Sequence, residues 1–174
     1  MYGVTGSGKS TLAARIGARI GLPYHAVDEL TWEPGWVPVS EQIQRERIGA
    51  ICAGDEWVLD SAYGIWLDLP LARADLVVGL DLPRLVSLSR LFRRTLRHVL
   101  RRDPTCNGNV ETVRNAFFSR DSILVWHFRS FTRKRTRMRA WQAGPAMPEV
   151  VLLRSAKEVE AWLTRLSGAG RPVD

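Results

Sequence analysis

The sequence predicts a three-layer α/β fold, in which helices cover both faces of a parallel sheet. Two observations predict it: short apolar runs alternate with longer segments of helical periodicity, and several of these runs end at an aspartate. The runs are continuous rather than alternating in polarity, which is typical of strands buried on both faces. The 174 residues suit one domain, which we place at residues 1–167, followed by a flexible tail at 168–174.

The expected elements follow from the apolar pattern and its breaks. After a truncated first strand we expect strands at 24–27, 57–59, 76–80 and 149–153, which makes a nominally five-stranded sheet. Helices are expected at about 7–20, from 40 onward, at 83–102, at 111–140 with an interruption, and at 155–166. Residues 30–39 predict a structured loop, and 103–109 a mobile connection inside an arginine-rich helical lid at about 97–120.

Residues 3–10, with the sequence GVTGSGKS, form a complete phosphate-binding loop of the P-loop NTPase type. The glycines let backbone N–H groups converge on phosphates, and the helix that follows adds its positive end. In this pattern Lys9 bridges the β- and γ-phosphates and Ser10 offers an oxygen to Mg²⁺. The motif therefore predicts an ATP and Mg²⁺ site. Its expected nucleotide contacts are Gly3, Thr5, Gly6, Ser7, Gly8, Lys9, Ser10 and Thr11.

The strand before this loop is unusually short, because only Met1 and Tyr2 precede Gly3. A phosphate-binding loop normally follows a buried central strand, and each unmade buried hydrogen bond would cost roughly 1–3 kcal/mol. We therefore expect the natural protein to begin several residues upstream with an apolar strand.

Three aspartates follow predicted strands, where ligands of open α/β sheets bind. Asp60 is expected to hold Mg²⁺ through water, and Asp28 to orient or deprotonate a substrate hydroxyl. The alternative for each is a turn or helix-capping residue. For Asp81, in Asp81-Leu82-Pro83, a helix start is the better explanation.

Positive charge is concentrated in one part of the chain. Residues 84–139 hold fourteen arginines and one lysine against three acidic residues, a net charge of +12, whereas the rest carries −5. Arginines that close over phosphates would neutralise charge during phosphoryl transfer, so Arg94 and Arg97 are candidate catalytic residues. A solvated helix face is the alternative. Trp32 or Trp36 could form the wall of a flat substrate site.

The two cysteines, Cys52 and Cys106, stand far apart. With no CxxC pair and three histidines, no zinc-type ligand cluster is expected. We expect a cytoplasmic protein without a structural disulfide or a secretory signal. No apolar run approaches the roughly 20 residues that cross a bilayer, so no membrane partner is expected.

The order of these features resembles the adenylate-kinase-like P-loop kinases, and in particular a group of small bacterial proteins known as DNA topology modulation proteins. The resemblance spans nearly the whole chain. It is carried by residues 3–11, 24–28 with 32–36, 57–64, 74–84 and 151–155. The block of Asp28, Trp32 and Trp36 is more specific than the loop, which many NTPases share.

The resemblance implies an ATP site under an arginine-bearing lid. It places Arg90 on the adenine and Arg94 on a phosphate, and it places the turn at Arg154 beside the adenine. Asp28, Trp32 and Tyr63 are expected to contact the acceptor. Two features depart from the pattern: Ser61-Ala62 replaces a usual Gly-Asn, and the lid stretch 103–109 is shorter than in long-lid adenylate kinases.

The favoured function is an ATP-dependent phosphotransferase that moves the γ-phosphate to a nucleotide or another small hydroxylated acceptor. The first alternative is a non-catalytic ATP-binding regulator whose basic part contacts nucleic acid. This is less favoured because the sequence has no recognisable nucleic-acid module. The second alternative is a slow ATPase. Neither the acceptor nor the oligomeric state follows from the sequence.

Overall fold

The computed structural model describes residues 1–60, 64–101, 104–110, 123–144 and 148–168. The helices are α1 Lys9–Ile20, α2 Val27–Thr31, α3 Glu41–Ala53, α4 Asp68–Leu71, α5 Arg84–Arg101, α6 Ile123–Ala143 and α7 Ala156–Gly168, with a 3₁₀ turn η1 at Cys106–Gly108. The strands are β1 Tyr2–Gly3, β2 Tyr24–His25, β3 Trp32–Glu33, β4 Val37–Pro38, β5 Val58–Leu59, β6 Leu76–Leu80, β7 Pro104–Thr105, β8 Asn109–Val110 and β9 Glu149–Leu153.

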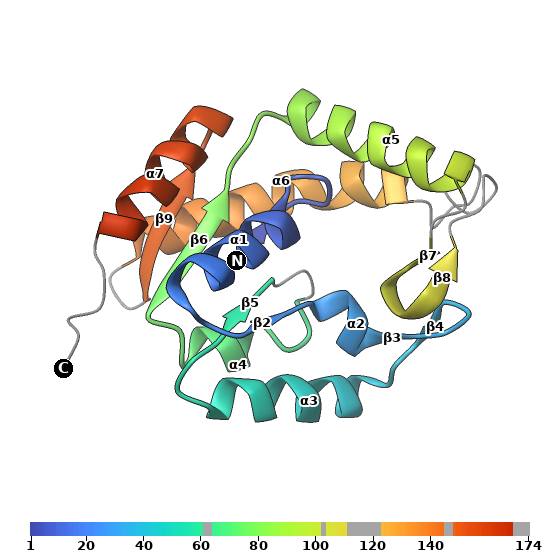
Figure 1. Cartoon of the computed structure of the whole chain (residues 1–174), viewed down its shortest axis with the longest axis horizontal. Helices are drawn as coiled ribbons and strands as arrows, with labels where there is room; N and C mark the ends of the chain where they lie inside the picture. The colour runs from blue at the N-terminus through green and yellow to red at the C-terminus, as the bar shows by residue number, and fades with distance from the viewer. Residues whose placement is uncertain (61–63, 102–103, 111–122, 145–147, 169–174) are drawn as a thin grey trace.

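The central sheet consists of five parallel strands in two hydrogen-bonded parts. One part has the order β1-β6-β9 and the other pairs β2 with β5. The amino group of Met1 donates to the carbonyl of Leu59 at 2.6 Å, so the two parts meet between β1 and β5. The resulting order is β2-β5-β1-β6-β9, and the predicted fold class is confirmed (Figure 1).

Helices cover both faces of this sheet. On one face, α1 and α7 pack over a core of eight buried residues that includes Leu12, Ile16, Leu80 and Leu163. On the other face, α6 packs against β1 and β9, and its Met138 is buried with residues from β6 and β9. α3 packs on the same side of β5 through Ile48, Cys52 and Leu59. The carboxyl ends of the strands therefore lie between these two layers of helices.

The local structure differs from the expectations in three segments. The segment 24–27 is a strand only as far as His25, and Asp28 lies in the first turn of α2 rather than beyond a strand end. The segment 30–39 contains an antiparallel hairpin of β3 and β4, turned by Gly35 and Trp36 at φ values of 82° and 59°. Residues 104–110 form a second small hairpin, β7 with β8, where the sequence predicts a mobile connection.

The predicted arginine-rich lid at 97–120 is described at its start, where α5 ends, and in the β7–β8 hairpin. Residues 111–122 lie outside the described part, so the helix predicted at 111–140 is seen from Ile123 onward. Figure 1 shows α5 and α6 next to each other, with the β7–β8 hairpin near the end of α5. Among the described residues, no helix is long and apolar enough to span a bilayer.

Candidate functional site

A cleft of about 1470 Å³ opens above the loop that joins β1 to α1. Two glycines of this loop have left-handed backbones, Gly6 with φ 77° and Gly8 with φ 97°. A Cβ atom added to Gly6 would lie 2.5 Å from the carbonyl oxygen of Ser87 and 2.7 Å from Cβ of Leu91. The loop therefore needs glycine here both for its turn and for its close contact with α5.

Lys9 begins α1 and is only 8% exposed. Its Nζ donates to the carbonyl of Val4 at 3.0 Å, and the Ser7 hydroxyl donates to the same oxygen at 2.7 Å. Burial lowers the pKa of the Lys9 ammonium group, whereas the carboxylates of Asp60 and Asp28 raise it. A buried cation thus lies where the loop amides and the start of a helix already favour an anion.

Asp60 follows β5 and is 6% exposed. Its carboxylate accepts hydrogen bonds from the Ser10 hydroxyl, from the Tyr24 hydroxyl at 3.2 Å and from the Val27 amide at 2.8 Å. Burial, together with the negative charge of Asp60, raises the pKa of Tyr24, so this hydroxyl keeps its proton and remains a donor. Ser10 and Asp60, the two residues that the sequence predicts at a magnesium ion, are therefore hydrogen-bonded to each other.

The Ser10 and Asp60 oxygens are a donor set that suits Mg²⁺, which binds hard oxygen ligands and retains several waters. Among the described residues, no group of three His, Cys, Asp or Glu side chains could hold a metal ion. A magnesium ion here would therefore complete its coordination with phosphate oxygens and water, as is usual where a metal binds together with a nucleotide.

α5 places two of the predicted arginines at the cleft. Arg90 Nη1 donates to the carbonyl of Ser7 at 3.2 Å, and Arg90 and Arg94 both line the cleft. Arg97 and Arg154 are exposed, and neither is among the described residues that line the cleft. Arg154 instead has its backbone amide bonded to Glu158 at 2.9 Å, which closes the start of α7.

The other side of the cleft is formed by α2 and the β3–β4 hairpin, which contribute Asp28, Trp32 and Trp36. The two indole rings pack edge to face with centroids 5.8 Å apart. Aromatic walls of this kind suit a flat or apolar substrate surface. Tyr63, the third residue predicted on this side, lies outside the described residues.

The β7–β8 hairpin is hydrogen-bonded to this side of the cleft. The Cys106 thiol donates to the carbonyl of Asp28 at 2.8 Å, and the Asn107 amide donates to the carbonyls of Glu29 and Trp32 at 2.8 and 2.6 Å. Asn109 accepts from the amide of Trp36 at 2.8 Å. The β7–β8 hairpin is thus joined to α2 and to the β3–β4 hairpin by side chain-to-backbone hydrogen bonds.

Asp81 has no direct place in the cleft. It is 2% exposed and accepts from Arg135 Nε at 2.7 Å and from Arg139 Nε at 2.8 Å. These two arginines are one helical turn apart, so both reach the same carboxylate from α6. Asp81 therefore anchors α6 to the end of β6, whereas the sequence explained it as a helix start.

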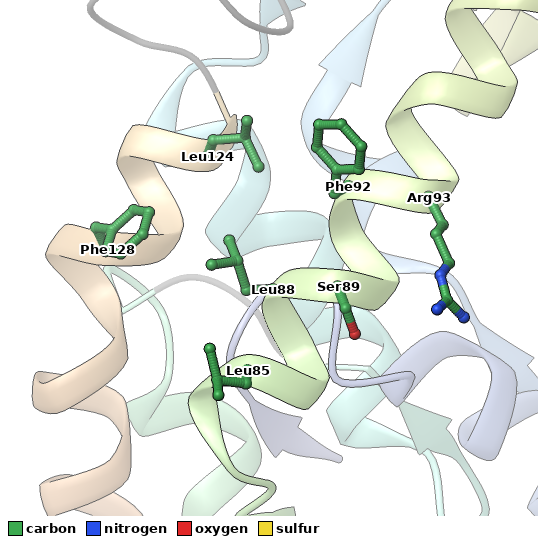
Figure 2. A pocket seen from close by; sticks show the side chains of 7 residues that line it. All are labelled: Leu85, Leu88, Ser89, Phe92, Arg93, Leu124 and Phe128. Carbon is green, nitrogen blue, oxygen red and sulfur yellow. The ribbon is translucent and has the colours of Figure 1, made fainter.

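A second, smaller hollow of about 420 Å³ lies between α5 and α6 (Figure 2). It is lined by Leu85, Leu88, Ser89, Phe92, Arg93, Leu124 and Phe128, and Figure 2 shows the leucine and phenylalanine side chains of the two helices facing it. Apolar lining offers no hydrogen bonds to phosphates, so this hollow is not the nucleotide site.

Sequence analysis missed several residues that line the cleft. From α6 these are Trp126 and Arg129, and from earlier segments Tyr24, His98 and Cys106. The expected strand 24–27 does place Tyr24 near Asp60, but the sequence does not show that its hydroxyl points toward the carboxylate. For Trp126 and Arg129 the only signal is the basic and aromatic composition of the segment.

A left-handed glycine loop leading into a helix, a strand-end aspartate bonded to the first helical serine, and the strand order described above define a P-loop kinase fold. A solved structure with similar architecture is a gluconokinase from Sinorhizobium meliloti 1021, with a TM-score of 0.51 and 20% sequence identity. The alignment covers 96% of this chain and 91% of that one. At this identity the likeness concerns the fold. No family model matches the chain, and no curated protein matches it in sequence.

Proposed function

We propose that this protein is a small-molecule kinase that transfers the γ-phosphate of ATP to a hydroxyl group of a small acceptor. The observation that carries the proposal is a single cleft lined by Lys9 and Ser10 on one side and by Asp28 and Trp32 on the other. A cleft of about 1470 Å³ is large enough for a nucleotide and a second small molecule. The solved structure of similar fold is that of a gluconokinase.

The phosphate end of ATP would lie on the amides of the glycine loop and on Lys9. Ser10 and Asp60 would hold Mg²⁺, which on binding would neutralise charge on the phosphate oxygens. Arg94 would contact the phosphates, and Arg90 would stack on the adenine. Arg97 would neutralise charge on the phosphates, and Arg154 would lie beside the adenine. Both side chains would have to turn toward the cleft to do so.

On the acceptor side, Asp28 would accept the proton of the attacking hydroxyl or orient that hydroxyl. Its position in the first turn of α2 fits this role, because the side chain is exposed and lines the cleft. Trp32 would provide the wall against which the acceptor lies, and Tyr63 remains a proposed contact. General acid–base groups of this kind contribute roughly 10²–10⁴-fold to rate.

The test is a phosphate-transfer screen of ATP against nucleoside monophosphates, nucleosides and small hydroxylated metabolites, including sugar acids. Lys9→Ala is the control. We expect it to abolish transfer while the domain stays folded, since in the described part of the structure the Lys9 ammonium group makes one hydrogen bond, to the carbonyl of Val4. Transfer that persists in Lys9→Ala, or MgATP that fails to bind the unaltered protein in calorimetry, would contradict the proposal.

A nucleic-acid-binding regulator of the DNA topology modulation type is the second candidate, and the exposed arginines of α5 are the observation that favours it. Phosphate-backbone binding falls steeply as salt rises, because neutralised phosphates release counterions. DNA binding that is salt-sensitive and unchanged in Lys9→Ala would support this candidate. A slow ATPase would instead release phosphate to water with every acceptor in the screen.

A further inference from the structure

The chain has three lysines, Lys9, Lys134 and Lys157, and the second of them is buried without an evident reason. Lys134 lies on α6 and is 4% exposed. The neighbouring turn of the same helix face carries Met138, whose sulfur packs against β6 near Gly79. A buried ammonium group is costly unless it is paired, so a packing role alone would be better filled by another apolar residue.

The position of Lys134 along α6 follows from the topology. α6 ends at Ala143 and is followed by β9, which starts at the amino edge of the parallel sheet. Lys134 precedes Met138 by one helical turn, about 5.4 Å, and therefore lies closer to the carboxyl edge of the sheet. Arg135, next to Lys134 in sequence, bonds to Asp81 at that edge. Lys134 thus lies near the level of the phosphate-binding loop, although, like Arg97 and Arg154, it is not among the described residues that line the cleft, so its side chain would have to turn toward the phosphates.

The charged groups around Lys134 leave an excess of positive charge. Lys9, Arg133 and Arg137 act on it with the same sign, and Asp28 acts with the opposite sign. Burial raises the pKa of Tyr2, whereas the charges of Arg137 and Arg133 lower it, and Arg133 lies 5.9 Å from the centre of the Trp126 ring. Within the described part of the chain, Lys134 itself makes no hydrogen bond or ion pair.

These neighbours identify the anion that Lys134 would bind. Among the charged groups, Lys9 influences Lys134 most, and the carboxylate that influences it is Asp28. Under the proposed function, on which this inference rests, Lys9 holds the γ-phosphate and Asp28 receives the acceptor proton. The group that lies between those two residues during the reaction is the phosphoryl group.

We propose that Lys134 is a second ammonium ligand of the transferred phosphoryl group. During transfer, the acceptor oxygen forms a bond to the γ-phosphorus, and the bond from that phosphorus to the β–γ bridging oxygen breaks. The bridging oxygen keeps the electron pair and leaves with ADP, while the hydroxyl proton passes to Asp28. Lys134 keeps its own proton throughout and stabilises the negative charge on the phosphoryl oxygens.

The environment of Lys134 gives this role a separate thermodynamic signature. Burial, followed by the charges of Lys9 and Arg133, lowers the pKa of Lys134 to about 7, although Asp28 raises it. At pH 8 most Lys134 side chains are therefore neutral before a ligand binds. An arriving γ-phosphate would draw a proton onto Lys134, so binding would be coupled to proton uptake. At this pH the phosphate itself, with a second pKa of about 6, is already ionised.

The experiment is titration calorimetry of MgATP and MgADP at pH 8, in two buffers of different ionisation enthalpy, with four proteins. These are the unaltered protein, Lys134→Met, Lys134→Arg and the control Arg165→Met, which removes an exposed cation from α7. We expect Lys134→Met to weaken MgATP at least about ten-fold more than MgADP. The extra proton uptake with MgATP should disappear as well. Lys134→Arg should retain part of the preference for MgATP, and Arg165→Met all of it.

The possible outcomes separate this inference from the proposed function. If the unaltered protein binds neither nucleotide, both are overturned. If it binds both nucleotides and Lys134→Met keeps the same ratio of affinities, or loses both affinities equally, only the role of Lys134 is overturned. Circular dichroism checks that each variant is folded. If Lys134→Met fails to fold, the test relies on Lys134→Arg and on the proton uptake of the unaltered protein. Equal proton uptake with MgATP and MgADP would then refute the inference.

Discussion

The hydroxyl of Ser10 donates to the carboxylate of Asp60, which connects the first turn of α1 to the end of β5 across fifty residues of sequence. The same carboxylate also accepts from Tyr24 and from the Val27 amide, so it fixes the start of α2 relative to the phosphate-binding loop. One buried side chain thereby links the proposed metal site to the helix that carries Asp28.

This relationship predicts that Asp60→Asn reduces the part of ATP affinity that depends on magnesium. Asparagine keeps a carbonyl oxygen for Val27 but removes the negative charge that a divalent ion needs. We expect MgATP to bind about ten-fold or more weakly, with little change for ATP in excess chelator, measured by calorimetry. Asp55→Asn, on an exposed loop, is the control and should bind like the unaltered protein. Equal magnesium dependence in both variants would exclude Asp60 from the metal site.

Gly6 and Gly35 offer a matched pair of substitutions, because their φ values are 77° and 82°. An alanine at either position adds left-handed strain of roughly 1–2 kcal/mol. A Cβ at Gly6 would also lie 2.5 Å from the Ser87 carbonyl, whereas a Cβ at Gly35 would meet nothing within 4 Å. We expect Gly6→Ala to lower the free energy of unfolding by about 2 kcal/mol more than Gly35→Ala, in urea titrations.

Nucleotide binding should separate the same two variants. Gly6→Ala should lose MgATP binding, since the loop cannot keep its contact with α5, while Gly35→Ala should retain it. Comparable loss in both variants would mean that the conformation of the loop at Gly6 is not what presents its amides to the phosphates.

The loop and α1 could be predicted from the sequence because the information is local: glycine spacing, a lysine and the following helical pattern occupy adjacent residues. The position of Asp28 could not, because β2 is limited to the two residues that pair with Val58 and Leu59 in β5. That pairing depends on a distant segment. The hairpin of residues 104–110 was missed for a similar reason, since Asn107 and Asn109 bond to the backbone near Trp32 and Trp36.

The buried face of α6 shows a further limit of sequence reasoning. Its buried residues His127, Ser130, Phe131, Lys134 and Met138 follow helical spacing. However, polar and charged residues at most of these positions hide the pattern that normally identifies a core-facing helix. Sequence reasoning therefore treated α6 only as part of a basic region, and the composition alone does not distinguish Lys134 from the more exposed arginines around it.

The burial of Lys134 predicts a dependence of stability on pH. Its pKa is about 7 in the folded protein, and in the unfolded chain it returns to its ordinary value near 10.4. Between these values the unfolded chain binds a proton that the folded chain does not, so this group makes the protein more stable as pH rises. The destabilisation is complete below about pH 7 and vanishes above about pH 10.5, and it amounts to at most roughly 5 kcal/mol.

Lys134→Met should therefore be more stable than the unaltered protein at pH 7, and the difference should shrink as the pH approaches 10. The charges that face Lys134, those of Lys9, Asp28, Arg133 and Arg137, remain in both proteins, so the difference isolates the one ammonium group. Urea unfolding at several pH values measures it. A variant that is less stable at pH 7, or a difference that does not vary with pH, would show that the ammonium group is stabilised in the folded protein.

Asp28→Asn should lower turnover far more than it lowers MgATP affinity. The side chain lies on the acceptor side of the cleft, and the carbonyl of the same residue, which accepts from Cys106, is unaffected by the substitution. Asparagine cannot take the hydroxyl proton, so we expect kcat to fall by about 10²-fold or more at pH 7.5 once an acceptor is known. Glu29→Gln, the next residue on α2 and also exposed to the cleft, is the matched control for lost negative charge. If both variants slow transfer to the same small extent, the loss of one negative charge near the cleft explains the effect. Asp28 is then not the group that receives the proton.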